Sequence, residues 1–335
     1  MIEERLRNLV ISGFGVKLTK SGDLIEVLDK DGSKKHISPH DLEQVIITGE
    51  ASITSGVVRL LLEKEVDLVF IGRYPPLFAR VVRSDQSFIS DIWRAQIMMS
   101  DEVKLEIGRE ILQSAVYNRI RMLQHLSKNR EDLTFDDAVR RLKEVRRKME
   151  KAEDSFELMG YEGEGSHIYF SSIRRVIPEK LSFEGRKKRP PPDPVNALLS
   201  YGYTVLHSRV EYGLMLAGLN PFEGIIHASY RNRPALSFDL TEEFRQVIVD
   251  RVVLTDIVRG RVKERDFEYD NESGGCFMVE EFKRGFLERL YARFEEEYTV
   301  EEEGKMQFID IIFRQAKKLK RAIMGEEQYR GFRYR

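Results

Sequence analysis

The chain has 335 residues, of which 41% are hydrophobic and 33% charged, and its net charge is −1. This composition is typical of a water-soluble globular protein with one large or two smaller domains. The near-zero net charge excludes a protein that is basic throughout, so any nucleic-acid binding must come from local basic patches. The single cysteine, Cys276, excludes an internal disulfide and a cysteine cluster for zinc.

The sequence gives no indication of a membrane or secreted protein. Its apolar runs all fall short of the roughly 20 residues that a membrane span needs. The N-terminal stretch MIEERLRNLV carries acidic residues and lacks the apolar core of a secretion signal. We therefore expect a cytoplasmic protein that does not associate with membranes.

Residues 1–85 are predicted to form a small β-rich domain. Their first part contains β-rich runs that are separated by the turn sequences KSGD and KDGS. Further strands are expected at 45–49, 66–72 and 76–83, and one covering helix at 51–65. Because the last two strands carry more apolar surface than one helix can bury, we expect this domain to form a homodimer interface.

Residues 86–325 are predicted to form a larger, all-α domain, which makes the fold class α+β and multidomain. Apolar residues recur at helical spacing in the following ranges: 88–128, 136–150, 193–220, 241–260, 278–297 and 306–325. The stretch FEGRKKRPPPDP (183–194) is expected to be a surface loop, because its proline run cannot continue a helix. Residues 326–335 are short and charged, and we expect them to be a mobile tail outside the core.

A local basic patch lies in residues 171–190, which contain seven basic and two acidic side chains. Such a patch is a candidate for contact with nucleic acid. The plain alternative is the solvated surface of a charge-rich, thermostable protein.

The stretch GYEGEGSHIYF (160–170) places a glutamate between glycines. If a helix from about 153 to 176 runs through it, Glu162, Ser166 and Tyr169 share one face. Each glycine costs roughly 1 kcal/mol in a helix interior, which a helix tolerates where something approaches its backbone closely. The alternative, a loop before the helix, has about equal weight.

Two further stretches combine polar residues with apolar surroundings. In DPVNALLSYGYTVL (193–206), Asp193 and Pro194 form a natural helix start, and Asn196 and Tyr203 share a face. Buried hydrogen bonding within the fold is the commoner role for such a pair.

The other stretch is IIHASYRNRPALSFDLTEEFR (225–245). Asp239 and Glu242 form a D-x-x-E capping box for a helix that would begin there. They also follow a lone histidine, His227, at a spacing where a metal ion could use them. Taken alone, the histidine is more often a structural hydrogen-bonding residue and the acids are more often a cap.

Together, the three stretches resemble the CRISPR-associated integrase family, the universal adaptation nuclease of those immune systems. They match its E-G-x-x-x-x-x-Y-F segment, its D-x-x-N-x-x-L-x-x-x-Y-x-x-L helix and its G-L-N-P-x-x-G-x-x-H segment with D-L-x-E-x-F-R-x-x-x-D. Glu162 and His227 are 65 residues apart, and His227 and Glu242 are 15 apart, in the family's order. A β-rich domain followed by a helical one is also the family's architecture.

The resemblance implies a metal site formed by Glu162, His227 and Glu242, with Asp239 as a further acidic position near it. Two carboxylates and one imidazole suit Mg²⁺ or Mn²⁺, whereas Zn²⁺ would more typically recruit a second histidine or thiolates. Glu164 and His167 stand where the family often has small apolar residues and could compete for the metal, although helical geometry places them off the Glu162 face. The supporting residues that we single out are Asn196, Tyr203 and Tyr169.

The resemblance also implies a DNA substrate, double-stranded and branched, and strand transfer by transesterification. The expected phosphate contacts are the arginines that lie close in sequence to the three ligands: Arg174, Arg175, Arg231, Arg233 and Arg245. The expected partners are a second copy of the chain and a small second protein of the same adaptation system. Two alternatives remain open, namely a transposon-type integrase that uses the same site and a non-catalytic DNA-binding protein.

Overall fold

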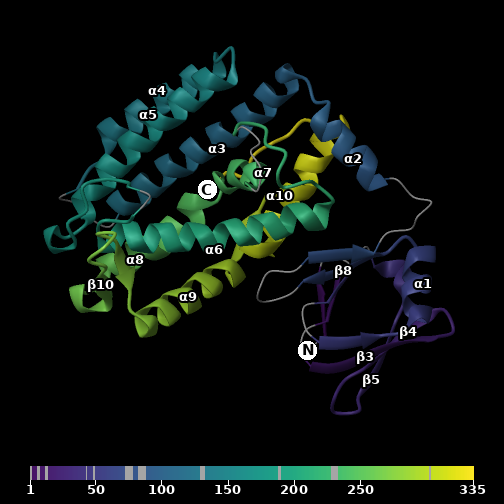
Figure 1. Cartoon of the computed structure of the whole chain (residues 1–335). Helices are drawn as coiled ribbons and strands as arrows, with labels where there is room; N and C mark the ends of the chain where they lie inside the picture. Colours follow the sequence, from purple (N-terminus) through teal and green to yellow (C-terminus); the bar gives the residue numbers. More distant parts are fainter. Residues whose placement is uncertain are drawn as a thin grey trace. The chain divides into compact units, whose positions relative to one another are not determined.

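The computed structural model describes residues 2–5, 8–11, 14–42, 44–47, 50–71, 78–81, 88–128, 133–187, 190–227, 233–301 and 303–335. The chain separates into two compact units, Met1–Phe88 and Ile89–Arg335. The first is rich in strands and the second in helices (Figure 1), which confirms the predicted fold class. We expected the boundary after residue 85, close to where the units divide.

The described residues of the first unit form two sheets and the α-helix α1 (Ser55–Glu63). One sheet has the strand order β1-β2-β6-β8-β9, and its inner pairs β2–β6 and β6–β8 are parallel. The other has the order β5-β4-β3-β7, in which β3 and β7 are parallel. The strands are β1 (Ile2–Arg5), β2 (Asn8–Ile11), β3 (Phe14–Ser21), β4 (Leu24–Leu28), β5 (Lys34–Ile37), β6 (Gln44–Ile47), β7 (Glu50–Ile53), β8 (Asp67–Ile71) and β9 (Phe78–Val81).

The turn sequences act as predicted, because Gly22 and Gly32 adopt positive φ angles of 60° and 84° between β3, β4 and β5. The expected helix at 51–65 is shorter, since residues 50–53 form β7 beside β3 and α1 (Ser55–Glu63) begins after them. Leu60 and Leu61 of α1 are buried in the core of this unit, together with apolar side chains of both sheets.

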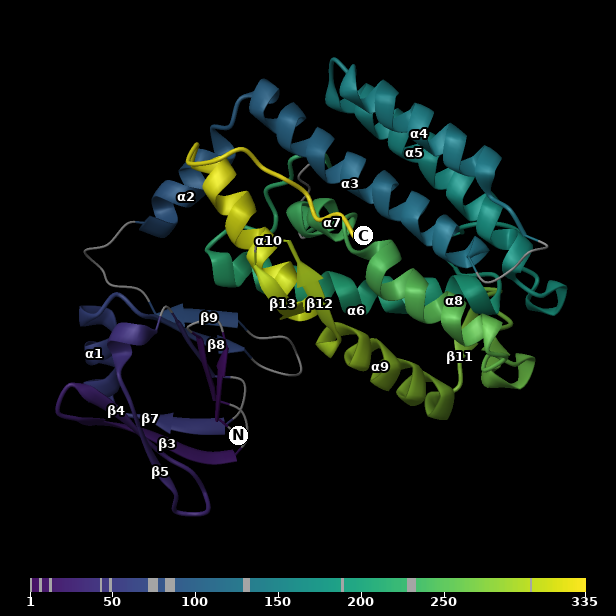
Figure 2. The same cartoon turned by 180° about the vertical axis from the view of Figure 1, so that it is seen from behind.

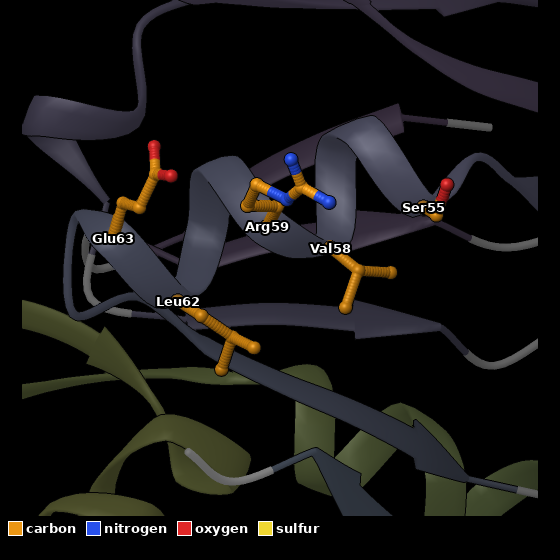
Figure 3. A pocket seen from close by; sticks show the side chains of 5 residues that line it. All are labelled: Ser55, Val58, Arg59, Leu62 and Glu63. Carbon is orange, nitrogen blue, oxygen red and sulfur yellow. The ribbon is translucent and has the colours of Figure 1, made fainter. Parts of the chain in front are cut away.

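The outer face of α1 carries a shallow depression of about 440 Å³. Figure 3 shows the side chains that line it, which are Ser55, Val58, Arg59, Leu62 and Glu63. The candidate metal ligands belong to the other unit, so this depression is not the predicted site.

The second unit is built mainly from long helices. Two groups pack within it: α3 lies against α4 and α5, and α6 lies against α7 and α10 (Figure 2). The helices are α2 (Phe88–Ile97), α3 (Asp101–Ser127), α4 (Asp136–Glu150), α5 (Ser155–Ile173), α6 (Pro194–Ala217), α7 (Ala235–Thr241), a π-helical turn (Arg245–Asp250), α8 (Arg251–Val258), α9 (Glu280–Glu295) and α10 (Phe308–Ile323). Short 3₁₀ turns lie at Pro39–Asp41 in the first unit and at Arg174–Val176, Glu179–Leu181 and Glu264–Asp266 in this one.

Several details of this unit differ from the prediction. The pattern at 88–128 is two helices, because Ser100 caps a new helix by accepting a hydrogen bond from the Val103 N–H. The unit is not purely helical, since it contains the hairpins β10–β11 (Phe267–Tyr269, Cys276–Met278) and β12–β13 (Glu297–Val300, Gly304–Gln307). Among the described helices, none combines the length and apolarity of a membrane span.

The largest correction concerns residues 326–335. We expected a mobile tail outside the core, but Tyr329 and Phe332 are buried and belong to the hydrophobic core of the second unit. The buried aromatic side chains hold this segment against the core. The prediction failed because it considered only the charged residues of the segment.

Candidate active site

The three predicted ligands come from three neighbouring parts of the helical unit. Glu162 lies within α5, His227 follows the turn after α6, and Glu242 lies directly after α7. The negative charge of Glu162 and the imidazole of His227 both act on the Glu242 carboxylate, so the fold brings the three side chains into one neighbourhood.

Helix α5 runs through the glycine-rich stretch without interruption, so the helical interpretation of GYEGEG is correct and the loop alternative is wrong. The Asp154 carboxylate caps the helix by accepting from the Glu157 N–H at 2.8 Å. Gly165 explains one of the glycines, because a β-carbon there would lie only 3.3 Å from an Arg119 guanidinium nitrogen and 3.4 Å from Val116. This glycine therefore lets α3 approach α5 closely at the site.

Arg119 of α3 lies between the two glutamates. Its guanidinium donates to the Glu162 carboxylate at 2.5 Å and lies 3.8 Å from the Glu242 carboxylate. The Arg119 side chain is 1% exposed. Burial disfavours its charge, but the charges of Glu162 and Glu242 outweigh burial and raise the pKa of Arg119. Arg119 is thus a permanent cation between two acids.

Glu242 is the most deeply placed of the predicted ligands. Burial raises the pKa of its carboxyl group, and the neighbouring Glu162 charge adds to the rise, while Arg245 and Arg119 lower it. One of its oxygens pairs with Arg245 at 2.8 Å, and the other is buried without a hydrogen-bond partner. This second oxygen lies 3.8 Å from the Arg119 guanidinium, beyond hydrogen-bond distance, and is a candidate ligand atom for a cation.

His227 is oriented by Asp239. The Asp239 carboxylate is fully buried, and one of its oxygens lies 2.6 Å from His227 Nδ1. The same carboxylate accepts hydrogen bonds from the backbone N–H groups of Ile225, Ile226 and His227. Asp239 therefore fixes both the loop and the ring, which leaves Nε2 as the nitrogen for an external ligand.

The contacts of Asp239 correct the capping-box prediction. Helix α7 begins at Ala235, four residues before Asp239, and Glu242 follows its last residue. Asp239 is consequently inside the helix and Glu242 is at its end, so neither side chain caps the N-terminus. Pro234, which precedes the helix, was the start signal in the sequence, because proline is tolerated at the beginning of a helix.

The predicted supporting residues form a second buried layer. The Tyr203 hydroxyl donates to Asp250 at 2.6 Å, and the Arg245 guanidinium lies over the Tyr203 ring at 5.0 Å. Burial raises the pKa of Asp250 to about 6, although the hydrogen bond from Tyr203 lowers it, and Tyr169 of α5 is fully buried. This layer lies behind Glu242, since Arg245 contacts both Tyr203 and Glu242.

Asn196 has the buried hydrogen bonds that we gave as the commoner role for such a residue. It is buried near the start of α6, and its amide contacts Asp193 and the carbonyl of Gly185. Its oxygen accepts from the Lys187 N–H at 2.8 Å and from Arg186 at 2.9 Å. Asn196 therefore holds the start of the predicted basic loop against α6.

The predicted phosphate contacts fall into three groups. Arg174, Arg175 and Arg233 are exposed at the surface. Arg245 is instead partly buried and paired with Glu242, so it belongs to the site itself. Arg231 lies outside the described residues.

Sequence reasoning missed Arg119 and did not assign a role to Asp250. The signal for Arg119 was its position among residues of α3 that all prove to be buried, such as Val116 and Ile120. An arginine within an apolar helical stretch requires an anionic partner.

The three predicted ligands are of the chemical types that bind a hard divalent cation. Glu162, Glu242 and His227 offer carboxylate oxygens and one ring nitrogen, which suit Mg²⁺ or Mn²⁺. Within the part of the chain that the structure describes, however, no three acidic, histidine or cysteine side chains stand close enough to form a ready-made metal cluster. The guanidinium groups of Arg119 and Arg245 now contact the carboxylates that an ion would use.

Comparison with known proteins places the chain in a family. Residues 9–292 match the family model described as CRISPR associated protein Cas1. The chain is similar to CRISPR-associated endonuclease Cas1 1 of Methanospirillum hungatei JF-1, with 31% identity over 98% of this chain and 100% of the relative. It is also similar to CRISPR-associated endonuclease Cas1 1 of Archaeoglobus fulgidus, with 30% identity over 97% of this chain and 98% of the relative.

Solved structures share the fold. A casposase bound to integration product has a TM-score of 0.84 at 19% identity and covers 97% of both chains. A partial Cas6-RT-Cas1–Cas2 complex contains a chain with a TM-score of 0.79 at 25% identity, with 97% of this chain and 98% of that chain covered. Because the family model spans most of the sequence and full-length relatives carry its name, this chain belongs to the CRISPR associated protein Cas1 family.

Proposed function

We propose that the chain is a metal-dependent DNA endonuclease and integrase that inserts captured foreign DNA fragments into a CRISPR array by transesterification. The observation that carries this proposal is the buried Glu242 carboxylate beside Glu162 and His227, with one oxygen that forms no hydrogen bond among the described residues and lies 3.8 Å from Arg119. Membership in a family whose relatives are named endonucleases supports it.

In this proposal Glu162, Glu242 and Nε2 of His227 hold a Mg²⁺ or Mn²⁺ ion. Such an ion, when bound, neutralises charge on the attacked phosphate and activates the attacking hydroxyl or water. Asp239 holds the Nδ1 side of His227, so in the neutral ring the proton lies on Nδ1 and Nε2 is the acceptor. Arg119 and Arg245 keep the two carboxylates ionised and in place.

The bond changes in strand transfer balance without a cofactor that is consumed. The 3′-hydroxyl of the captured fragment gives up its proton, and its oxygen forms a bond to a phosphorus atom of the array strand. The bond between that phosphorus and the 3′-oxygen of the array strand breaks, and the leaving oxygen takes up a proton. One phosphodiester replaces another, so the protein has to supply mainly positioning and charge stabilisation.

DNA cleavage and joining by ligand variants test the proposal. We expect Glu162→Ala, His227→Ala and Glu242→Ala each to abolish Mn²⁺-dependent cleavage of a branched duplex while DNA affinity stays largely intact, because affinity rests on phosphate contacts elsewhere. Glu164→Ala is the matched control, since Glu164 lies on the same helix but is exposed and paired with Lys148. Near-native activity of one ligand variant in Mn²⁺ would remove that residue from the set.

The assembly belongs to the same proposal. We propose a homodimer formed through residues of about 1–85, because Phe14 and Leu24 of this unit are 69% and 39% exposed. We also propose a small second adaptation protein as partner, supported by the similarity to a chain of a solved Cas6-RT-Cas1–Cas2 complex. Light scattering at micromolar concentration tests the dimer, and Phe14→Ser should weaken it. A monomeric wild-type protein would contradict this arrangement.

A transposon-type integrase is the second candidate, favoured by the structural similarity to a casposase. The two functions differ in the target DNA. Preferential joining to a duplex that carries the CRISPR repeat supports the first function, and equal joining to duplexes without a repeat supports the second. A protein that binds DNA but joins neither target in Mn²⁺ or Mg²⁺ would instead be the non-catalytic alternative.

A further inference from the structure

The last ten residues of the chain, 326–335, form a strap across the core of the helical unit, and we refer to them as the C-terminal strap. Phe332 is buried, and its ring stacks on Phe244 with centroids 5.4 Å apart and planes 13° apart. Phe244 lies two residues after Glu242. The strap therefore packs directly against the segment that carries one of the proposed ligands.

The strap also surrounds the residue that follows Glu242. Glu243 is fully buried, and its carboxylate accepts three hydrogen bonds. Two come from the strap, namely from the Tyr329 hydroxyl at 2.7 Å and from the Phe332 N–H at 2.7 Å. The third comes from the Gln315 amide of α10 at 3.1 Å. Because all three donors point at one side chain, the backbone around Glu242 is tied to the strap.

The strap reaches the other side of the site through Asn118. The Asn118 amide donates to the carbonyl oxygens of Glu243 at 2.8 Å and Phe332 at 3.0 Å. Its oxygen accepts from the Tyr334 N–H at 2.8 Å. Asn118 directly precedes Arg119, the cation between Glu162 and Glu242. The strap thus contacts the sequence neighbour of Arg119 and the sequence neighbour of Glu242 at once.

We propose that the C-terminal strap positions the candidate active site. By holding Asn118 and Glu243, it fixes the positions of their neighbours Arg119 and Glu242 relative to each other. The proposal rests on the proposed function, since it concerns the same metal-dependent chemistry. The Arg119 guanidinium and the Glu242 carboxylate are 3.8 Å apart. A displacement of about 1 Å in either backbone would change that separation substantially, and such misplacements cost on the order of a hundredfold in rate.

Gly331 offers a way to lift the strap without altering any group in the site. Its backbone lies flat on α3, where an added β-carbon would stand 2.9 Å from the Glu110 carbonyl oxygen and 2.9 Å from the Ser114 β-carbon. Neither atom can move without displacing α3. Gly331→Ala should therefore detach the strap, whereas Gln328→Ala, which alters an exposed strap side chain, is the matched control.

The test measures the full-length variants in three ways. Limited trypsin digestion reports whether the strap is lifted, because Arg330 and Arg333 become cleavable. Electron paramagnetic resonance of free Mn²⁺ gives the metal affinity, and cleavage of a labelled branched duplex gives the rate at saturating Mn²⁺. For Gly331→Ala we expect a lifted strap, a rate lowered by roughly tenfold to a hundredfold and weaker Mn²⁺ binding, with DNA affinity unchanged. Gln328→Ala should behave as wild type.

Deletion of residues 326–335 with peptide add-back guards against a trivial loss of folding. A free 326–335 peptide should restore the rate of the deleted protein, and a peptide with Tyr329→Phe and Phe332→Ala should not. If the deleted protein loses its helical circular dichroism, the single change Tyr329→Phe in the full chain takes its place and should lower the rate with the fold intact. A lifted or absent strap with an unchanged rate and Mn²⁺ affinity would overturn the proposal. A wild-type protein that neither binds Mn²⁺ nor cleaves DNA would instead overturn the proposed function.

Discussion

Replacement of Arg119 by methionine is the perturbation with the clearest expected signature. Methionine fills a similar volume but removes the cation between Glu162 and Glu242. Breaking a buried ion pair by removing one partner costs about 3–5 kcal/mol, because a charge is left buried and uncompensated. Glu242 is 5% exposed and Glu162 is 27% exposed. Solvent therefore screens part of the pair between Arg119 and Glu162. We expect the free energy of unfolding to fall by about 3 kcal/mol, at the lower end of that range.

Metal ions should partly reverse this loss. In Arg119→Met a divalent ion replaces the cation beside Glu162, while Arg245 still pairs with Glu242. Binding of the ion should therefore stabilise the folded variant more than the folded wild type. At a free concentration of one hundred times its dissociation constant, an ion stabilises the folded state by about 2.7 kcal/mol. We therefore expect Mn²⁺ to raise the free energy of unfolding of the variant by more than that of the wild type.

Urea denaturation followed by tryptophan fluorescence measures both the loss of stability in Arg119→Met and its reversal by Mn²⁺, and it does so for the helical unit. Trp93, the only tryptophan, lies in α2 and donates to the Gly218 carbonyl, so its signal reports on the helical unit. Arg140→Met is the matched control, because Arg140 forms solvent-screened, exposed ion pairs on α4 and its loss should leave the stability nearly unchanged. The account of Arg119 is wrong if Arg119→Met is as stable as the control, or if Mn²⁺ stabilises it no more than the wild type.

Three further predictions follow from the site and its surroundings. Asp239→Asn should be severe for Mn²⁺ affinity and for stability, since an amide cannot accept from both the backbone donors and His227 Nδ1; unchanged metal binding by calorimetry would refute this. Arg174→Ala and Arg233→Ala should each reduce the salt dependence of DNA binding by a slope of roughly one, and an unchanged slope for both would move the DNA path elsewhere. Burial raises the pKa of Asp250 from 3.8 to about 6, so its contribution to stability is present at low pH and is lost as the pH rises through about 6. Asp250→Asn should remove this pH dependence of the melting temperature. The assignment is wrong if the melting temperatures of variant and wild type depend on pH in the same way.

The parts of the site that could be predicted are those with local signals. The N-cap at Asp193 and Pro194 indicated α6, and the helical face of Glu162 followed from its spacing to Tyr169. The capping interpretation of Asp239 failed because a local motif cannot show that a carboxylate is satisfied by the backbone of residues 225–227.

The contacts that sequence reasoning missed connect distant parts of the chain. Arg119 pairs with Glu162 from 43 positions away, and Tyr329 reaches Glu243 from 86 positions away. Such pairs depend on how helices pack, which periodicity does not specify. The strap was misjudged for a related reason, since Tyr329 and Phe332 stand among charged residues and only the fold provides their apolar surroundings.

The most direct test of the central claim is a joining assay with a matched pair of DNA fragments. One fragment ends in a 3′-hydroxyl and the other in a 3′-deoxy end, and each is labelled and mixed with a duplex that carries the CRISPR repeat, the wild-type protein and Mn²⁺. Because the proposed reaction requires attack by the 3′-oxygen, we predict a covalent joined product with the 3′-hydroxyl fragment alone, and no product with chelator or with Glu242→Gln. Equal joining of the 3′-deoxy fragment, or joining that persists without a divalent metal, would contradict the account.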